Sequence, residues 1–537
     1  MDRRHFITRS PLVGVVLSSL FTGSCNSGAQ SSGRTSGTAG SFILDELSIS
    51  QLQERLTRGS MSSRELVNLY LKRIAEIDQH GPALKSVIEV NPDAVSIATQ
   101  LDAERKSGNY RGPLHGIPFL LKDNIDTGDK MMTTAGSLAL SGHHARRDAP
   151  IVQQLRAAGA ILLGKTNLSE WANFRSSRSS SGWSSRGGQT RNPYSLERNP
   201  CGSSSGSGVA VAANLCAFAI GTETNGSISC PSSVNGIVGL KPTVGLVSRT
   251  GIIPISKTQD TAGPMTRWVH DAALVLGVIS GVDAQDEATA GRPAAMSLDY
   301  VEPLGVASLR GKRIGVEKSF LKIHEKIDAL LHDAISAMKN AGASVVEVSY
   351  AEKLKDIGDD EYKLLKYEFK DGLNRYLENS GAAVRSLKEL IAFNEANASS
   401  VMPFFGQEIL LESEAMGSLD SEDYKKVRSN VVTTARQAID GTIKEHNLDA
   451  LCGPATGAAW CTDVVNGDSF SGYGMGSGAA MAGYPSVTVP FGEVHNLPVG
   501  LLFTASAFSE RSLLQIAHAY EQVSRKRTPP SLRPSLL

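Results

Sequence analysis

The sequence predicts an α/β protein in which helices flank a large mixed or parallel β-sheet. Residues 149–167, APIVQQLRAAGAILLGKTN, have the pattern of a helix, a glycine turn and an apolar strand. Residues 312–349 have the order strand, helix (near 324–340), strand. This alternation is typical of α/β folds. No linker-like stretch interrupts the chain after residue 41, so we expect a single domain over residues 42–537.

Other segments carry local signals of their own. Residues 62–78 place apolar side chains three and four positions apart, and Ser62 with Glu65 forms a capping-box pattern at the start of this predicted helix. The remaining predictions are a buried strand or loop at 113–126, a small-residue helix at 208–221, mainly helices over 351–446, and strands at 450–455 and 485–492.

The composition excludes several classes of function. The chain has 537 residues, with 54 Lys plus Arg and 54 Asp plus Glu, so no basic excess indicates nucleic-acid binding. The six cysteines form no C-x-x-C pair, which argues against a structural zinc site. We expect most of them to be small core residues.

Residues 1–41 have the features of an export signal followed by a Ser/Gly-rich segment. Arg3 and Arg4 precede the short apolar run at 11–21, which is the order of a twin-arginine signal. The stretch TGSC at 22–25 resembles a lipoprotein cleavage site, with Cys25 as the candidate for a lipid anchor, although the usual Leu is missing. No other apolar run is long enough to span a bilayer. We therefore expect an exported protein of the periplasm or cell envelope, without a transmembrane segment.

Three polar stretches next to apolar segments are the candidates for chemistry. They are GIPFLLKDN at 116–124, CGSSSGSG at 201–208, and GTETNGSIS at 221–229. Taken singly, a lysine after a strand is usually solvated and a Ser/Gly cluster is usually a turn or a helix cap. However, the third stretch lies between two apolar segments, where a flexible linker is not expected.

Together, the three stretches resemble the amidase signature family of serine hydrolases. The match includes Gly116-Ile117-Pro118 followed by Lys122-Asp123, and it extends to GLKPT at 239–243 and DTAGPM at 260–265. It covers about residues 45–525, and three stretches (176–188, 221–228 and 245–265) are most similar to the peptide amidase branch, which removes C-terminal amides from peptides. The resemblance implies the amidase signature fold, a peptide or small-molecule amide substrate, no nucleic-acid partner, and no metal or organic cofactor.

The resemblance also implies the roles of individual residues. Ser227 corresponds to the nucleophile, Ser203 to a serine with a cis peptide bond, and Lys122 to the base of a Ser-Ser-Lys triad, with Ser204 in a supporting role. The backbone N–H groups of Thr224, Asn225, Gly226 and Ser227 would form the oxyanion hole.

The chain departs from the family pattern at four positions. Glu223 replaces the common Asp, Asn225 replaces a Gly, Ser229 replaces an Arg, and Cys201 replaces a Gly. The Glu is shared with the peptide amidase branch. None of these changes removes a catalytic atom, but Asn225 and Ser229 border the nucleophile and affect the geometry expected there.

The chemistry explains why these residue types are needed. A serine hydroxyl is a weak nucleophile until a base accepts its proton, and the developing oxyanion needs fixed N–H donors. A solvated lysine, with a pKa of about 10.4, is almost fully protonated at neutral pH. Burial lowers a lysine pKa by several units, and the run IPFLL before Lys122 is consistent with burial.

Four alternatives remain open from the sequence. A general amidase for small aliphatic or aromatic amides would use the same residues. So would the glutaminase-type subunit of a tRNA-dependent amidotransferase, although an export signal argues against it. The other two are a non-catalytic binding protein with the same fold and a Ser-His-Asp hydrolase using His115, His143 or His144, which lack the context of a nucleophile elbow.

Overall fold

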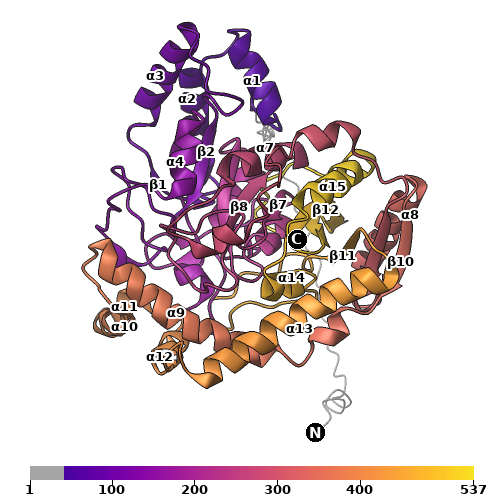
Figure 1. The fold of residues 1–537 in the computed structure, drawn as a ribbon. Helices are drawn as coiled ribbons and strands as arrows, with labels where there is room; N and C mark the ends of the chain where they lie inside the picture. The colour runs from indigo at the N-terminus through magenta and orange to yellow at the C-terminus, as the bar shows by residue number, and fades with distance from the viewer. Residues whose placement is uncertain (1–41) are drawn as a thin grey trace, which may run out of the picture. The chain divides into compact units, whose positions relative to one another are not determined.

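An eleven-stranded mixed sheet forms the centre of the fold (Figure 1). The computed structural model describes residues 42–537; the predicted export signal and Cys25 lie outside the described residues. The strand order is β1-β3-β2-β6-β8-β7-β12-β13-β11-β9-β10, and a separate two-stranded ribbon pairs β4 with β5. The bounds of the strands are β1 Val87–Val90, β2 Pro118–Lys122, β3 Ile161–Thr166, β4 Trp183–Ser184, β5 Gly188–Gln189, β6 Phe218–Glu223, β7 Val238–Lys241, β8 Thr261–Thr266, β9 Arg313–Glu317, β10 Ser344–Val348, β11 Ala450–Pro454, β12 Ser486–Val494 and β13 Leu497–Thr504.

The sheet combines parallel and antiparallel pairs, as the sequence predicts. Strand β2 is parallel to both β3 and β6, whereas β6, β8, β7, β12 and β13 pair antiparallel in succession. Towards the other edge, β9 is parallel to β10 and β11. The carboxyl ends of β2 and β6 therefore meet at one edge of the sheet.

Helices flank this sheet and confirm the expected α/β fold. Their bounds are α1 Ile49–Thr57, α2 Ser63–Arg73, α3 Ala94–Lys106, α4 Pro150–Ala157, α5 Ser205–Ala212, α6 Ser229–Val234, α7 Val269–Ile279, α8 Glu325–Asn340, α9 Gly358–Ser380, α10 Leu387–Ala396, α11 Ala398–Val401, α12 Glu408–Glu414, α13 Glu422–His446, α14 Ser477–Ala482 and α15 Glu510–Ser524. The capping box predicted at Ser62 and Glu65 is present, and α2 continues as a π-helix over Ile74–Gln79. No helix among residues 42–537 combines the length and apolar character needed to cross a membrane.

The predicted helix at 208–221 is wrong in its second half. Helix α5 ends at Ala212, and strand β6 begins at Phe218. Asn214 has a φ of 56°, a left-handed conformation that interrupts a helix. The following apolar residues pair with β2 on one side and β8 on the other, so sheet pairing overrides the helical pattern of small residues.

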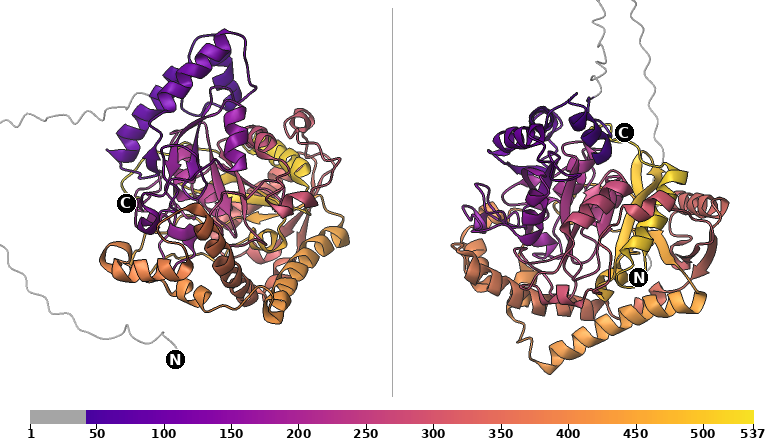
Figure 2. Two further views of the ribbon diagram at one scale, coloured as in Figure 1. Left: turned by 60° about the vertical axis from the view of Figure 1, so that its left-hand side comes forward. Right: turned by 45° about the horizontal axis from the view of Figure 1, so that its top comes forward.

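The region 351–446 is helical, as predicted, and has a hydrophobic core of its own. Helix α9 contributes Leu365, Phe369, Leu373 and Leu377, and these pack with apolar residues of α10 and α12. Both views in Figure 2 keep these orange helices together on one side of the purple and magenta strands. Helix α9 also packs against α13.

Candidate active site

Lys122 is the last residue of β2, and its side chain is fully buried. Its Nζ donates to Ser203 Oγ at 2.7 Å and to Thr222 Oγ1 at 2.8 Å, with a longer contact to the Thr222 carbonyl at 3.3 Å. Thr222 lies beside it because β2 and β6 are parallel neighbours. Asn124 donates to Thr222 Oγ1 at 3.1 Å. The structure therefore brings Lys122 and Ser203 together, and Thr222 and Asn124 complete a cluster that no sequence motif indicated.

Burial makes Lys122 a potential base. Removal of the ammonium from water lowers the pKa of Lys122 to about 7, while the carboxylates of Asp260 and Glu223 act in the opposite direction. A lysine with such a pKa is substantially neutral near pH 7, so its nitrogen can accept a proton.

Ser203 and Ser204 immediately precede α5, and the Gly202–Ser203 peptide bond is cis, as the resemblance implied. The Ser204 hydroxyl donates to the Thr222 carbonyl at 3.0 Å and accepts from the Thr222 N–H at 3.2 Å. Its backbone N–H donates to the carbonyl of Ser227 at 3.2 Å. Ser204 thus connects the first serine segment both to β6 and to the backbone of Ser227.

Ser227 lies in the loop that joins β6 to α6, and the residue is 8% exposed. Within residues 42–537, the backbone N–H groups of all four residues predicted to form the oxyanion hole, Thr224, Asn225, Gly226 and Ser227, donate to no acceptor. Gly226 has a φ of 86°, which glycine adopts without the steric cost of a side chain. Unpaired N–H groups on such a curved loop can bind an oxyanion.

Glu223 and Ser229, two of the departures from the family pattern, contact each other. Glu223 Oε2 accepts from the N–H groups of Ile228 at 2.7 Å and Ser229 at 2.8 Å. The Ser229 hydroxyl also donates to this oxygen at 3.2 Å. The carboxylate therefore holds the far end of the loop that carries Ser227 and caps the beginning of α6.

The two serine hydroxyls are not joined directly in this structure. Across residues 42–537, Ser203 Oγ accepts from Lys122, but no hydrogen bond links it to Ser227 Oγ. The geometry thus contains the lysine half of the expected triad and the loop that carries Ser227. The proton transfer between the serines stays a prediction.

A disulfide between Cys201 and Cys230 joins the two serine segments. The Cα atoms are 6.0 Å apart, and the two cysteines are separated by 29 positions. Cys201, Cys216, Cys230 and Cys452 are buried, which agrees with the expectation that most cysteines are small core residues, but the sequence did not predict this bond. The available signal was an export segment together with one cysteine close to each candidate serine.

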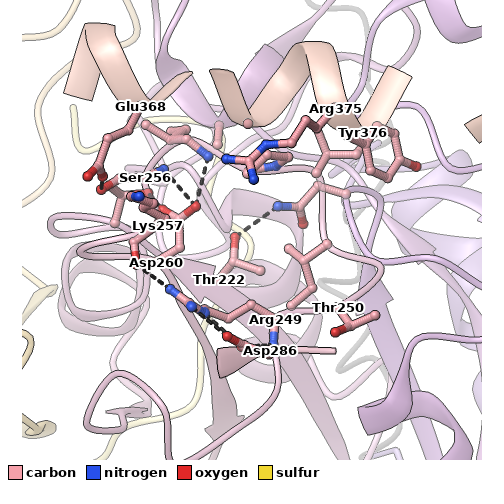
Figure 3. Close-up of a pocket in the computed structure, with 18 of the residues that line it drawn as sticks. Thr222, Arg249, Thr250, Ser256, Lys257, Asp260, Asp286, Glu368, Arg375 and Tyr376 are labelled. Carbon is pink, nitrogen blue, oxygen red and sulfur yellow. Dashed lines mark hydrogen bonds and ion pairs between the residues drawn. The ribbon is translucent and has the colours of Figure 1, made fainter. Parts of the chain in front are cut away.

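A cavity of about 430 Å³ lies next to this cluster (Figure 3). Asn124, Thr222 and Thr224 line it from the sheet side, and residues 249–257 form another wall. Figure 3 shows Arg375 and Tyr376 reaching over it from α9. Substrate can therefore approach the ends of β2 and β6 from a partly apolar, partly charged hollow.

The histidines have other partners. His115 Nε2 contacts the Leu101 carbonyl at 2.9 Å, His144 Nδ1 contacts the Met131 carbonyl at 3.2 Å, and His143 lies 3.4 Å from the Tyr376 hydroxyl. In the described part of the chain, none of them hydrogen-bonds to either candidate serine, and no group of His, Cys, Asp and Glu side chains is arranged to hold a metal ion.

Comparison with known proteins identifies the family. The sequence pattern of the family named Amidase matches residues 65–514. A probable amidase of Arabidopsis thaliana is 40% identical over 501 residues, covering 91% of this chain and 92% of that protein. A glutamyl-tRNA(Gln) amidotransferase subunit of Symbiobacterium thermophilum is 36% identical over 503 residues, covering 89% of this chain and 97% of that protein.

The solved structure of the native peptide amidase from Stenotrophomonas maltophilia is 51% identical, with a TM-score of 0.87. The likeness covers 91% of this chain and 99% of that one. The chain therefore belongs to the amidase signature family, as a hydrolase that acts on amide C–N bonds.

Proposed function

We propose that this amidase hydrolyses the C-terminal carboxamide of peptides to a carboxylate and ammonia. The observation that carries the mechanism is the buried contact between Lys122 Nζ and Ser203 Oγ at 2.7 Å. Similarity to the Stenotrophomonas maltophilia peptide amidase over nearly the whole chain supports the choice of substrate.

In the proposed reaction, Ser227 Oγ attacks the carboxamide carbon. Its proton passes to Ser203, which gives its own proton to neutral Lys122. The N–H groups of residues 224–227 stabilise the oxyanion. Return of the proton through Ser203 allows the C–N bond to break with release of ammonia, leaving an acyl ester on Ser227. Water, deprotonated by the same route, then attacks the ester to give the carboxylate and restore the serine.

The direct test measures ammonia released from C-terminally amidated peptides, benzamide and glutamine. We expect release from the peptide amides, and we expect Ser227→Ala, Ser203→Ala and Lys122→Ala to reduce kcat by roughly 10⁴-fold or more, as in other serine hydrolases. Ser232→Ala is a matched control, because the buried Ser232 hydroxyl lies in the adjoining helix α6 and has no hydrogen-bond partner among residues 42–537.

The substrates separate the competing functions. Release only from benzamide would indicate a general amidase, and release only from glutamine would indicate a glutaminase-type enzyme. Full activity of Ser227→Ala would contradict the proposed nucleophile for every substrate.

A further inference from the structure

A carboxylate from the helical region contacts the loop that carries the nucleophile. Glu361, in the first turns of α9, accepts at Oε1 from Asn225 Nδ2 at 2.7 Å and from Gln259 Nε2 at 2.8 Å. Gln259 Nε2 also donates to the Thr224 carbonyl at 3.3 Å. One carboxylate oxygen thus accepts hydrogen bonds from two amide side chains. Asn225 belongs to the loop, and Gln259 is hydrogen-bonded to it.

These contacts fix the direction of a backbone N–H. The Thr224 carbonyl and the Asn225 N–H belong to the same planar peptide unit and point in opposite directions when that unit is trans. A hydrogen bond that holds the Thr224 carbonyl therefore also orients the Asn225 N–H, one of the four N–H groups of residues 224–227 that have no acceptor in residues 42–537. The hydrogen bond from the Asn225 side chain to Glu361 restrains the same residue a second time.

The loop needs such anchors because of its own composition. Gly226 follows Asn225 with a φ of 86°, and an added Cβ there would meet nothing within 4 Å. A glycine in open space has wide conformational freedom, so packing against this residue does not restrain the loop. The other end is held by Glu223, and the Thr224 hydroxyl donates to Asp260 at 2.5 Å. Asn225, a departure from the family glycine, supplies an additional anchor.

We propose that Glu361 is a positioning residue that holds Asn225 and Gln259 so that the N–H groups of residues 224–227 face the oxyanion. The inference rests on the proposed function of this loop. Helix α9 also supplies Glu368, Arg375 and Tyr376 to the cavity wall (Figure 3), so the same helix lines the substrate hollow and holds the oxyanion loop. Glu361 acts as a hydrogen-bond acceptor, and a neutral carbonyl oxygen of the same geometry can replace it.

The test uses the full chain with Glu361→Ala, Glu361→Gln, Asn225→Gly and the double variant of Glu361→Ala with Asn225→Gly. We expect Glu361→Ala to lower kcat by about 10-fold with KM changed by less than about 2-fold, a smaller loss than removal of an oxyanion donor itself. Glu361→Gln keeps a carbonyl oxygen with two lone pairs and should restore most of kcat. The control is Asp359→Ala, which removes an exposed carboxylate from the same end of α9.

A double-mutant cycle distinguishes positioning from general destabilisation. If Glu361 acts partly through Asn225, the Glu361→Ala substitution should lower kcat by a smaller factor in the Asn225→Gly background than in the wild type. Fully additive losses, an unchanged kcat in Glu361→Ala, or a Glu361→Gln variant as impaired as Glu361→Ala would each overturn the proposal.

Labelling of the serine nucleophile by a fluorophosphonate probe makes the result independent of the amide substrate. Phosphonylation uses the same nucleophile and oxyanion loop, so Glu361→Ala should slow labelling by a factor similar to its loss of kcat. Slowed labelling in a protein that hydrolyses no peptide amide would overturn the proposed substrate and support the role of Glu361. Equal labelling rates for the wild type and Glu361→Ala would overturn that role whatever the substrate.

Discussion

The protonation state of Lys122 is the property of a single residue on which the proposed reaction most depends. Burial lowers its pKa to about 7, so the neutral base predominates above that pH and the ammonium below it. We expect kcat/KM to rise with pH through a midpoint near about 7, falling about tenfold per pH unit well below it. A pH–rate profile for a peptide amide checks this, and a flat profile from about pH 5 to 9 would contradict it.

The neighbouring carboxylate offers a directional test of the same assignment. The negative charge of Asp260 favours the protonated form of Lys122. Asp260→Asn should therefore move the midpoint of the profile to lower pH. An upward shift would show that another group controls the profile. Lys122→Arg should be inactive throughout, because a guanidinium keeps its proton over this range.

The disulfide links two elements of the site, namely the segment that enters α5 and the beginning of α6. It joins Cys201 to Cys230 across 29 positions, with Ser203 and Ser227 just inside its ends. We expect the double variant Cys201→Ser/Cys230→Ser to lose about 2–4 kcal/mol of unfolding free energy, because closure of a loop of this size restricts the unfolded chain. Denaturant unfolding measures the loss, and Cys461→Ser, at an exposed unpaired cysteine, is the control. Equal stability of the double variant and the wild type would contradict this role.

A buried ion pair fixes the loop between α11 and α12. Arg175 and Glu170 are both buried and their charged groups lie 2.6 Å apart. Arg175 also donates to the carbonyls of Val401, Phe405 and Gly406. Arg175→Met should lower the free energy of unfolding by about 3–5 kcal/mol, because it leaves a buried carboxylate and several carbonyl groups without their hydrogen-bond partner.

The matching control for this pair is Arg178→Met, three positions further on at an exposed site. Thermal unfolding of both variants measures the difference. If Arg175→Met unfolds at the same temperature as Arg178→Met, the ion pair does not stabilise this loop.

At the scale of the whole molecule, we propose export to the periplasm or cell envelope. The arginine pair followed by a short apolar run within residues 1–41 supports this proposal. The disulfide is also consistent with an oxidising compartment. A reporter fused after residue 41 should be exported, and Arg3→Lys with Arg4→Lys should block its export. Export of that double variant would contradict a twin-arginine route. Mass spectrometry of the mature N-terminus would show whether Cys25 is lipidated.

The sequence by itself determined the features that depend on local signals. Alternation of helix and strand patterns at 149–167 and 312–349 predicted the α/β fold, because amphipathic periodicity reflects which face of each element is buried. The motifs at 116–124, 201–208 and 221–229 indicated the family and the candidate residues. Each motif consists of residues that are adjacent in the sequence, so it can be recognised without knowledge of the fold.

Only the tertiary structure decided features that depend on contacts between distant segments. Residues 218–223 form a strand because β2 and β8 pair with them, although the small residues that precede them predicted a continuous helix over 208–221. Thr222 contacts Lys122 across 100 positions, and Asn225 contacts Glu361 across 136. Hydrogen bonding and burial act through space, so a local pattern cannot specify the partners that sheet formation and helix packing bring to a site.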